Sequence, residues 1–413
     1  MAMVGKSSNK YENRKVKNIR PALNSRSLGE LPLLLAENKE AVFILGLGTG
    51  VTLGTVLTHD IRQVLCLEIE HRVVEAAQFF SHVNGRAFQD KRARIIIDDA
   101  RSFLKNYPGR FDIIINEPSN PWIRGIANLF TVEFFQLCRA KLTEQGLICQ
   151  WLHLYGMSET DCQTALRSFL EVFPEAMFWQ GSHGDILMIG SKYPLKVDEE
   201  QAILRFEQHH VAFGNAGISS INQLLTYFIA FGKSILPWTL SSPLNRDNLP
   251  ILEFTTPLHL YNDESAALLQ SLSLHGYRDI PFETRQENSL LAQFLFFRAM
   301  QLLDYHEADK AKALLELSYE ETPTDPSVIY NLAMIYAATD DFENAQQLLI
   351  RSLKVNEQPI LWWGLANIYH NYGKYDEALA ACEKTLHLEP EFPEAQVLLE
   401  TIKQKLAAQH QDQ

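Results

Sequence analysis

The chain has 413 residues, of which 46% are hydrophobic and 21% charged, and Asp plus Glu outnumber Lys plus Arg by 50 to 37. This composition excludes a wholly disordered chain and provides enough apolar material for two or three domains. The net charge of −13 argues against nucleic acid or an anionic membrane as a partner, because both would repel the protein.

The five cysteines are scattered along the chain, without a C-x-x-C pair or a His partner at metal-ligand spacing. This pattern predicts neither a metal site nor a disulfide framework, and it suits a reducing compartment. No apolar run approaches the roughly 18 residues that a membrane-spanning helix needs. The N-terminal stretch is polar, with seven basic residues between Lys6 and Arg26, and has no signal-peptide core. We therefore expect a cytoplasmic protein.

Residues 1–40 are expected to form a flexible lead-in, which ends in the apolar stretch 31–35. From Ala41 onward, short β-rich apolar runs alternate with amphipathic helical patterns. Strands that are apolar on both faces and separated by helices predict a parallel sheet with helices on each side. Residues 41–195 should therefore form an α/β domain with a doubly wound, Rossmann-like sheet. The predicted strands are 42–45, 64–67, 95–97, 113–115 and 147–149, and the clearest predicted helices are 51–57, 69–81 and 131–142.

Residues 196–288 are expected to be a helical connecting segment, with helices near 199–208 and 221–231 that pack against the sheet or lead to the next domain. Residues 289–410 contain an internal repeat. Small residues recur at spacings of 34 and 33 in two series, which are Ala299, Ala333 and Ala366, and Ala311, Ala345 and Ala378.

This all-α repeat resembles the tetratricopeptide repeat, whose small residues let two antiparallel helices approach closely. Three units would span about 292–392, and the segment 394–406 would be the terminal capping helix. The resemblance implies a protein or peptide partner bound in the groove of the repeats, and Trp363 is a candidate for that contact.

The first predicted strand leads directly into a glycine-rich loop, Gly46-Leu47-Gly48-Thr49-Gly50, and then into a predicted helix. Glycines suit a sharp turn at which a nucleotide-like ligand lies against the bare backbone. A tight turn without a ligand is the alternative interpretation.

Acidic residues follow the next two predicted strands. Glu68 lies 18 residues after Gly50, where a carboxylate can accept hydrogen bonds from both hydroxyls of a ribose. Asp98 and Asp99, followed by Ala100, end the third strand, where a carboxylate can bind an adenine amino group. Such acids can also simply cap the next helix, but three strand ends at one edge of the sheet favour an adenosine-containing ligand.

The fourth predicted strand runs into the sequence Glu117-Pro118-Ser119-Asn120-Pro121. Its two prolines predict a rigid loop at the carboxyl edge of the sheet, where open α/β sheets bind their ligands. Glu117 is the only ionisable group in this loop and is therefore the candidate base. Helix capping or plain solvent exposure of Glu117 remains the alternative.

Together these segments resemble the spermidine synthase family of aminopropyltransferases, which share the fold of class I S-adenosylmethionine methyltransferases. The resemblance covers about residues 29–194 and touches 245–261. It implies that decarboxylated S-adenosylmethionine, or S-adenosylmethionine itself, is bound as co-substrate by Gly46, Gly48, Thr49, Gly50, Glu68, Asp98, Asp99 and Ala100. It also implies transfer of the aminopropyl group to a small-molecule amine such as putrescine, with Glu117 as the base, Ser119 and Asn120 positioning the amine, and no metal ion. A homodimer is a further possibility.

The chain departs from the family pattern at three positions. Thr49 stands where the glycine loop of the family normally has an aspartate, and Glu117 and Asn120 stand where its catalytic loop normally has two aspartates. Thr49 favours a second hypothesis, an S-adenosylmethionine-dependent methyltransferase, because Gly-x-Gly-Thr-Gly is a common methyltransferase loop. A third hypothesis is a catalytically weakened domain that serves as a scaffold for protein binding by the repeats. The Glu-Pro-Ser-Asn-Pro pattern is similar to spermidine synthase-like domains fused to membrane spans.

Overall fold

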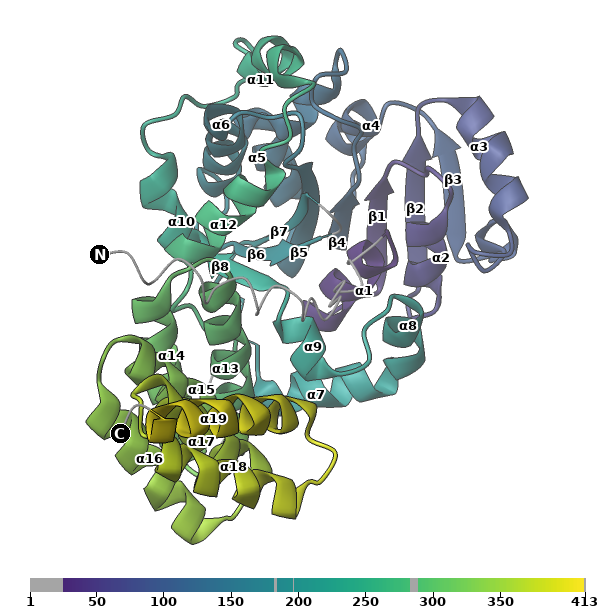
Figure 1. Cartoon of the computed structure of the whole chain (residues 1–413). Helices are drawn as coiled ribbons and strands as arrows, with labels where there is room; N and C mark the ends of the chain where they lie inside the picture. Colours follow the sequence, from purple (N-terminus) through teal and green to yellow (C-terminus); the bar gives the residue numbers. More distant parts are fainter. Residues whose placement is uncertain (1–24, 182–183, 196, 283–288, 412–413) are drawn as a thin grey trace. The chain divides into compact units, whose positions relative to one another are not determined.

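A computed structural model of the chain describes residues 25–181, 184–195, 197–282 and 289–411. The chain divides into two compact units, one ending at residue 283 and the other starting at residue 284 (Figure 1). The first unit contains a large sheet flanked by helices, and the described part of the second unit is helical. The predicted fold class, a Rossmann-like α/β sheet followed by an all-α repeat domain, is confirmed.

The sheet of the first unit is mixed. Its strands are β1 (Ala41–Leu45), β2 (Gln63–Glu68), β3 (Ala93–Ile97), β4 (Phe111–Asn116), β5 (Leu142–His153), β6 (Met177–Gln180), β7 (Asp185–Ser191) and β8 (Phe228–Phe231). They lie in the order β3-β2-β1-β4-β5-β7-β6-β8, and the first five are parallel. β7 runs antiparallel to β5, and the pairs β6–β7 and β6–β8 are also antiparallel. The order of the parallel strands reverses between β1 and β4, so the topological switch point lies at the carboxyl ends of these two strands.

The helices cover both faces of the sheet. On one face, α4 (Ala100–Asn106), α5 (Val132–Lys141) and α6 (Glu159–Leu170) share a core with alternate residues of the strands, among them Phe43, Leu65 and Ile114. On the other face, α1 (Ser25–Leu35) packs against β4, β5 and α2 (Val51–Leu57). Strands β1 and β4 are buried along their whole length, which explains their uninterrupted apolar sequences.

The structure corrects the expected lead-in. Residues 1–24 lie outside the described residues, but Ser25–Leu35 form helix α1. Leu31, Leu33 and Leu34 of this helix are buried, and so is Glu30. Because α1 covers part of the sheet, residues 25–35 belong to the core of the first unit.

The connecting segment also differs from the expectation, because it belongs to the first compact unit through residue 283. It contains the expected helix α7 (Glu199–Gln208), followed by α8 (His210–Asn215), α9 (Ile221–Leu225), α10 (Gly232–Thr239), α11 (Ile251–Thr255) and α12 (Ser265–His275). Residues 228–231, expected to be helical, instead form the edge strand β8, since they pair with β6.

The second unit is a series of helices: α13 (Ser289–Asp304), α14 (Ala308–Glu321), α15 (Pro326–Ala338), α16 (Phe342–Val355), α17 (Pro359–Asn371), α18 (Tyr375–Leu388) and α19 (Pro393–Gln411). Neighbouring helices pack in pairs, and the six recurring alanines are all completely buried. Small side chains at these positions let the helices approach closely, as the repeat pattern predicts. The expected capping helix is α19.

Candidate active site

The predicted site residues lie at the carboxyl edge of the parallel strands. Backbone hydrogen bonds connect this edge directly: Gly46 N–H donates to Leu67 O (2.9 Å), and Glu117 N–H donates to Leu45 O (3.1 Å). Asp98 N–H in turn donates to Glu68 O (3.1 Å). The glycine loop therefore lies between the backbone of Glu117 on one side and the end of β2 on the other.

The glycine loop uses backbone conformations that favour glycine. Gly46, Gly48 and Gly50 have φ angles of 94°, 51° and 78°, in the left-handed region. A Cβ atom on Gly46 would lie 2.7 Å from the carbonyl oxygen of Glu117. Gly48 and Thr49 are exposed, so the tip of the loop is open to a ligand.

Glu68 holds the glycine loop in place through its side chain. Its Oε2 accepts a hydrogen bond from Leu47 N–H (3.1 Å), and its Oε1 accepts one from Glu70 N–H (3.1 Å). A carboxylate offers about four acceptor positions. About two remain on this half-buried side chain for further donors.

Asp98 and Asp99 are exposed, and Ala100 is buried. Asp99 caps α4, because its Oδ1 accepts a hydrogen bond from Ser102 N–H (2.7 Å). Asp98 accepts a hydrogen bond from Asp99 N–H (2.8 Å). The alternative interpretation of these acids as helix caps is therefore correct for Asp99, although capping leaves further acceptor positions on its carboxylate.

Glu117 is half-buried, and a contact that the sequence did not reveal fixes its side chain. The buried hydroxyl of Thr52, on α2, donates a hydrogen bond to Glu117 Oε2 at 2.7 Å. Burial, followed by the charges of Glu68 and Glu117, raises the pKa of the Cys66 thiol. The two acids therefore lie within electrostatic range of the same thiol.

An aromatic cluster lies beside the loop after β4. Ser119 is exposed, and Asn120 Oδ1 accepts a hydrogen bond from the Tyr155 hydroxyl (3.4 Å). The rings of Trp122 and Tyr155 are 6.0 Å apart and meet edge to face. Burial, followed by the charge of Asp185, raises the pKa of Tyr155.

Behind this cluster, His153 Nδ1 lies 2.9 Å from Asp185 Oδ1, and both side chains are buried. Sequence reasoning assigned no role to His153 and could not pair it with Asp185, because β5 and β7 pair only in the folded sheet. The pair orients the ring that packs against Tyr155, at a centroid distance of 4.8 Å.

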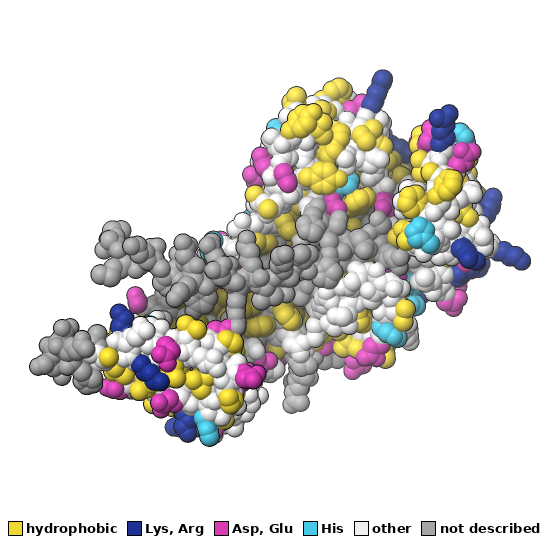
Figure 2. All heavy atoms as spheres, turned by 45° about the vertical axis from the view of Figure 1, so that its right-hand side comes forward, with side chains coloured by type: hydrophobic (Ala, Val, Ile, Leu, Met, Phe, Trp, Pro, Cys, Tyr) yellow, Lys and Arg dark blue, Asp and Glu magenta, His cyan; other side chains and the backbone are white. Residues whose placement is uncertain are grey.

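The segment 245–262 completes this side of the site. The fully buried Asn245 donates to Ala127 O (3.0 Å) and accepts from Leu252 N–H (3.3 Å). Farther along, Gly156 N–H donates to Asn262 O (3.0 Å). Exposed apolar side chains gather at the end of the unit where α11 lies, and Phe254, Leu258 and Tyr261 are among them (Figure 2).

Within the described ranges, no cluster of three or more His, Cys, Asp or Glu side chains could hold a metal ion. None of the helices in the described part of the chain has the length and apolar character needed to cross a bilayer. All five cysteines are free and buried.

The glycine loop at the switch point, followed by acidic strand ends, assigns the first unit to the class of Rossmann-like α/β domains. Parts of the chain are similar to known protein families. Residues 22–180 match the spermine/spermidine synthase domain, and residues 302–369 and 361–392 match tetratricopeptide repeats. Residues 22–180 are thus similar to the spermine/spermidine synthase domain and residues 302–392 to tetratricopeptide repeats, as the resemblances implied.

Similar proteins include several named polyamine aminopropyltransferase. The one from Thermotoga maritima is 34% identical over 121 residues, which are 29% of this chain and 41% of the relative. The one from Thermococcus onnurineus is 31% identical over 150 residues, 36% of this chain and 53% of the relative. The chain therefore spans about half or less of the length of these relatives.

Two solved structures are also similar. The crystal structure of spermidine synthase from Thermotoga maritima is 25% identical in sequence to this chain. The matched region covers 47% of this chain and 74% of the chain in that structure, with a TM-score of 0.37. The structure of a spermidine synthase in complex with the transition state analogue AdoDATO is 24% identical in sequence to this chain. The matched region covers 47% of this chain and 73% of the chain in that structure, with a TM-score of 0.36.

Proposed function

We propose that the first unit is an aminopropyltransferase, which moves the aminopropyl group of decarboxylated S-adenosylmethionine to a small amine such as putrescine. The observation that carries this proposal is the position of Glu117, which Thr52 holds at the edge of the sheet beside the glycine loop. Relatives that match this domain carry the name polyamine aminopropyltransferase.

In this proposal the glycine loop and Glu68 bind the nucleoside. The acceptor positions left on Glu68 suit the two ribose hydroxyls, and the backbone of Gly46, Gly48, Thr49 and Gly50 contacts the ligand. Asp98, Asp99 and Ala100 form the adenine side. S-adenosylmethionine itself would use the same contacts.

The reaction requires a neutral amine. Its nitrogen attacks the methylene carbon beside the sulfonium, the C–S bond breaks with its electron pair going to sulfur, and methylthioadenosine leaves. An alkyl amine with a pKa of about 10.4 is mostly protonated at neutral pH, so deprotonation costs roughly 4–5 kcal/mol at ~1.4 kcal/mol per unit. Glu117, acting as general base, takes this proton and removes much of the cost.

The aromatic cluster forms the acceptor side of the proposed site. Ser119 and Asn120 can position the amine through hydrogen bonds, and the rings of Trp122 and Tyr155 can attract an ammonium group through cation–π contacts. The apolar side chains of residues 254–261 suit the carbon chain of such an amine. The free cysteines are compatible with this chemistry in the cytoplasm.

Titration of the full chain with methylthioadenosine, S-adenosylmethionine and its decarboxylated form, followed by addition of putrescine, tests the proposal. We expect amine-dependent release of methylthioadenosine, reduced at least ~100-fold in Glu117→Gln because the base is lost. Glu75→Gln is the matched control, because Glu75 is an exposed glutamate on α3 (His71–Ala77) that lies outside the proposed site. Binding without turnover of any amine would refute the proposed transfer.

A methyltransferase is the second candidate, and the Thr49 loop is the observation that favours it. Release of S-adenosylhomocysteine in the same titration would support it. For the repeats, we propose binding of a peptide segment through their groove, with Trp363 as a contact. The Trp363 ring is half-buried and lies 5.5 Å from Phe392. Peptide binding that persists without any nucleoside turnover would favour the scaffold hypothesis.

A further inference from the structure

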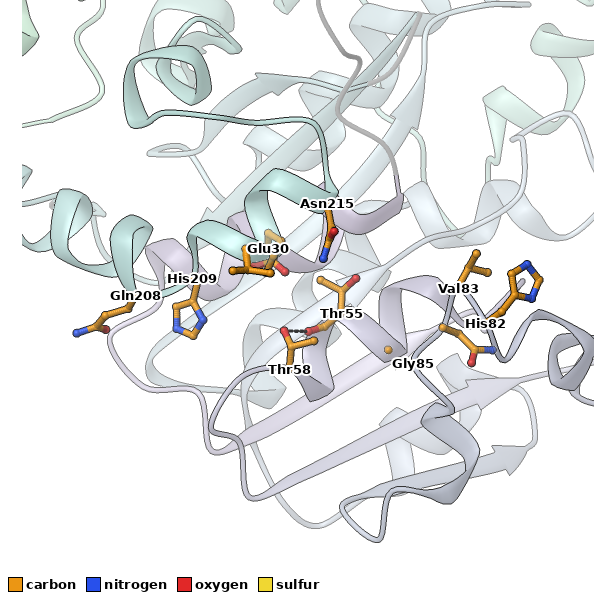
Figure 3. A pocket seen from close by; sticks show the side chains of 13 residues that line it. Glu30, Thr55, Thr58, His82, Val83, Gly85, Gln208, His209 and Asn215 are labelled. Carbon is orange, nitrogen blue, oxygen red and sulfur yellow. Dashed lines mark hydrogen bonds between the residues drawn. The ribbon is translucent and has the colours of Figure 1, made fainter.

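A cavity of about 430 Å³ lies between α1, α2, α8 and the loop at residues 82–85 (Figure 3). Its volume falls within the usual range of small-molecule sites, roughly 300–1,000 Å³. None of the site residues predicted from the sequence lines it. Its described lining contains one carboxylate, Glu30, and neither Lys nor Arg. The polar residues of the lining are Glu30, Thr55, Thr58, His82, Asn84, Gln208, His209 and Asn215.

Glu30 is 1% exposed and has a buried histidine as its partner. His59, 2% exposed, lies with Nε2 2.8 Å from Glu30 Oε2, while its Nδ1 is buried and has no hydrogen-bond partner among the described residues. A proton on Nδ1 would leave a buried N–H without an acceptor, which is costly. The hydrogen-bond pattern therefore favours an arrangement in which His59 donates from Nε2 to the Glu30 carboxylate.

His209 adds an acceptor to the wall of the cavity. Its ring stacks on that of His59 with centroids 4.0 Å apart and an interplanar angle of 29°. Burial, together with the neighbouring His59 and Lys39, lowers the pKa of His209 to about 4. At neutral pH the ring is uncharged, and one of its nitrogens can accept a hydrogen bond.

We propose that this cavity binds a small aliphatic ammonium ligand, such as a diamine or a polyamine, with Glu30 as its counter-charge. A primary ammonium group has three N–H donors and no acceptor. The wall offers it a carboxylate, the hydroxyl oxygens of Thr55 and Thr58, and the amide oxygens of Gln208 and Asn215. An anion would lack a fixed positive partner among the described residues of this lining.

Among the described residues, Lys39 is a competing cation. It lies within electrostatic range of Glu30, but it does not line the cavity. Burial, followed by the charge of Arg205, lowers the pKa of Lys39. Arg205 is itself occupied, since it donates hydrogen bonds to Leu34 O (2.9 Å) and Ala36 O (3.0 Å) at the end of α1.

The cavity shares structural elements with the proposed active site. Helix α2 contributes Thr55 to the cavity, and Thr58 directly after the helix also lines it, while Thr52 of α2 donates a hydrogen bond to Glu117. Asn84 lines the cavity, and its Nδ2 donates a hydrogen bond to Thr49 O in the glycine loop (3.1 Å). An ammonium ligand in the cavity would therefore change nucleoside affinity. This coupling rests on the proposed function and is reciprocal.

Calorimetric titration of the full chain with spermidine and putrescine tests the inference. We expect a spermidine site whose affinity falls at least ~10-fold in Glu30→Gln, the scale of one charge-assisted hydrogen bond. Asn215→Ala, at an exposed position of low folding risk, should weaken binding ~3-fold or more. Glu207→Gln is the matched control, because Glu207 is an exposed neighbour of Gln208 that does not line the cavity.

The outcomes separate this inference from the proposed function. Spermidine binding that survives in Glu30→Gln and Asn215→Ala but is lost in Glu117→Gln would place the amine only at the acceptor position, and would overturn the cavity assignment while supporting the transfer reaction. No amine binding at all, or binding of inorganic phosphate in its place, would also overturn it. For the coupling, saturating spermidine should change the Kd of methylthioadenosine in the wild type but not in Glu30→Gln; equal Kd values would refute it.

Discussion

Replacement of Glu68 tests the ribose assignment more directly than any other change. In Glu68→Ala the carboxylate is lost, and with it the acceptors of Leu47 N–H and Glu70 N–H, both at 3.1 Å. These bonds are long and the side chain is half-buried, so water can replace part of them. We expect the free energy of unfolding to fall by about 1 kcal/mol.

The effect on the ligand should be larger than the effect on stability. If Glu68 accepts hydrogen bonds from the ribose hydroxyls, its removal costs at least ~1.5 kcal/mol of binding, the loss of one charge-assisted hydrogen bond. This corresponds to a Kd for methylthioadenosine that is about 12-fold higher. Glu68→Gln keeps one carbonyl oxygen and should give an intermediate value.

Isothermal titration of methylthioadenosine into the wild type, both Glu68 variants and Glu75→Gln measures these affinities. Thermal unfolding of the same samples separates a lost contact from a damaged loop. An unchanged Kd in Glu68→Ala, with a lower melting temperature, would show that Glu68 only holds the glycine loop and would refute the ribose assignment.

Three further predictions follow from single contacts. Thr52→Val removes the donor to Glu117, so amine-dependent turnover should fall ~10-fold or more while methylthioadenosine affinity changes less than ~2-fold, because the base is less well positioned; equal turnover would contradict this role. Gly46→Ala places a methyl group 2.7 Å from Glu117 O at a φ of 94° and should lower the free energy of unfolding by ~2–3 kcal/mol in urea titrations. Gly214→Ala, where a Cβ meets nothing within 4 Å, is its control and should be neutral or stabilising. The pKa of His209 is about 4 in the folded chain, below its ordinary value of 6.5, so the unfolded chain binds the proton more readily and stability is lost as the pH falls from 6.5 towards 4. After allowance for solvent screening of this partly exposed ring we expect a loss of ~1 kcal/mol, which His209→Gln should abolish in unfolding curves compared at pH 7.5 and pH 5.

The parallel core of the first unit follows from its sequence because its strands are buried on both faces. Runs such as 42–45 and 113–115 are apolar at every position, so both faces of these strands must be buried. A parallel sheet covered by helices on each side is the arrangement that buries both faces. The carboxyl ends of adjacent parallel strands then meet at one edge. Glu68, Asp98 and Glu117 could therefore be placed together before any coordinates.

Helix α1 could not be predicted in the same way, because Gly29 and Pro32 disfavour a helix in isolation. The structure explains the glycine. A Cβ atom on Gly29 would lie 2.9 Å from the Thr55 methyl group, so the missing side chain allows α1 and α2 to pack closely. Strand β8 was missed for a related reason: Phe-Ile-Ala-Phe is a short apolar run that fits either structure, and only pairing with β6 decides it.

The pairing of Thr52 with Glu117 bears on how this chain departs from the family pattern. Glutamate is one methylene longer than the aspartate usual in the catalytic loop, and a longer side chain has more positions open to its carboxylate. The hydrogen bond from Thr52 removes part of this freedom, because it anchors Oε2 to a helix whose start is fixed by the glycine loop. The position of the proposed base is then set by α2 as much as by its own loop. Helix α2 also contributes Thr55 to the cavity that Glu30 lines. A ligand bound in that cavity can therefore shift the carboxylate of Glu117 through this one helix.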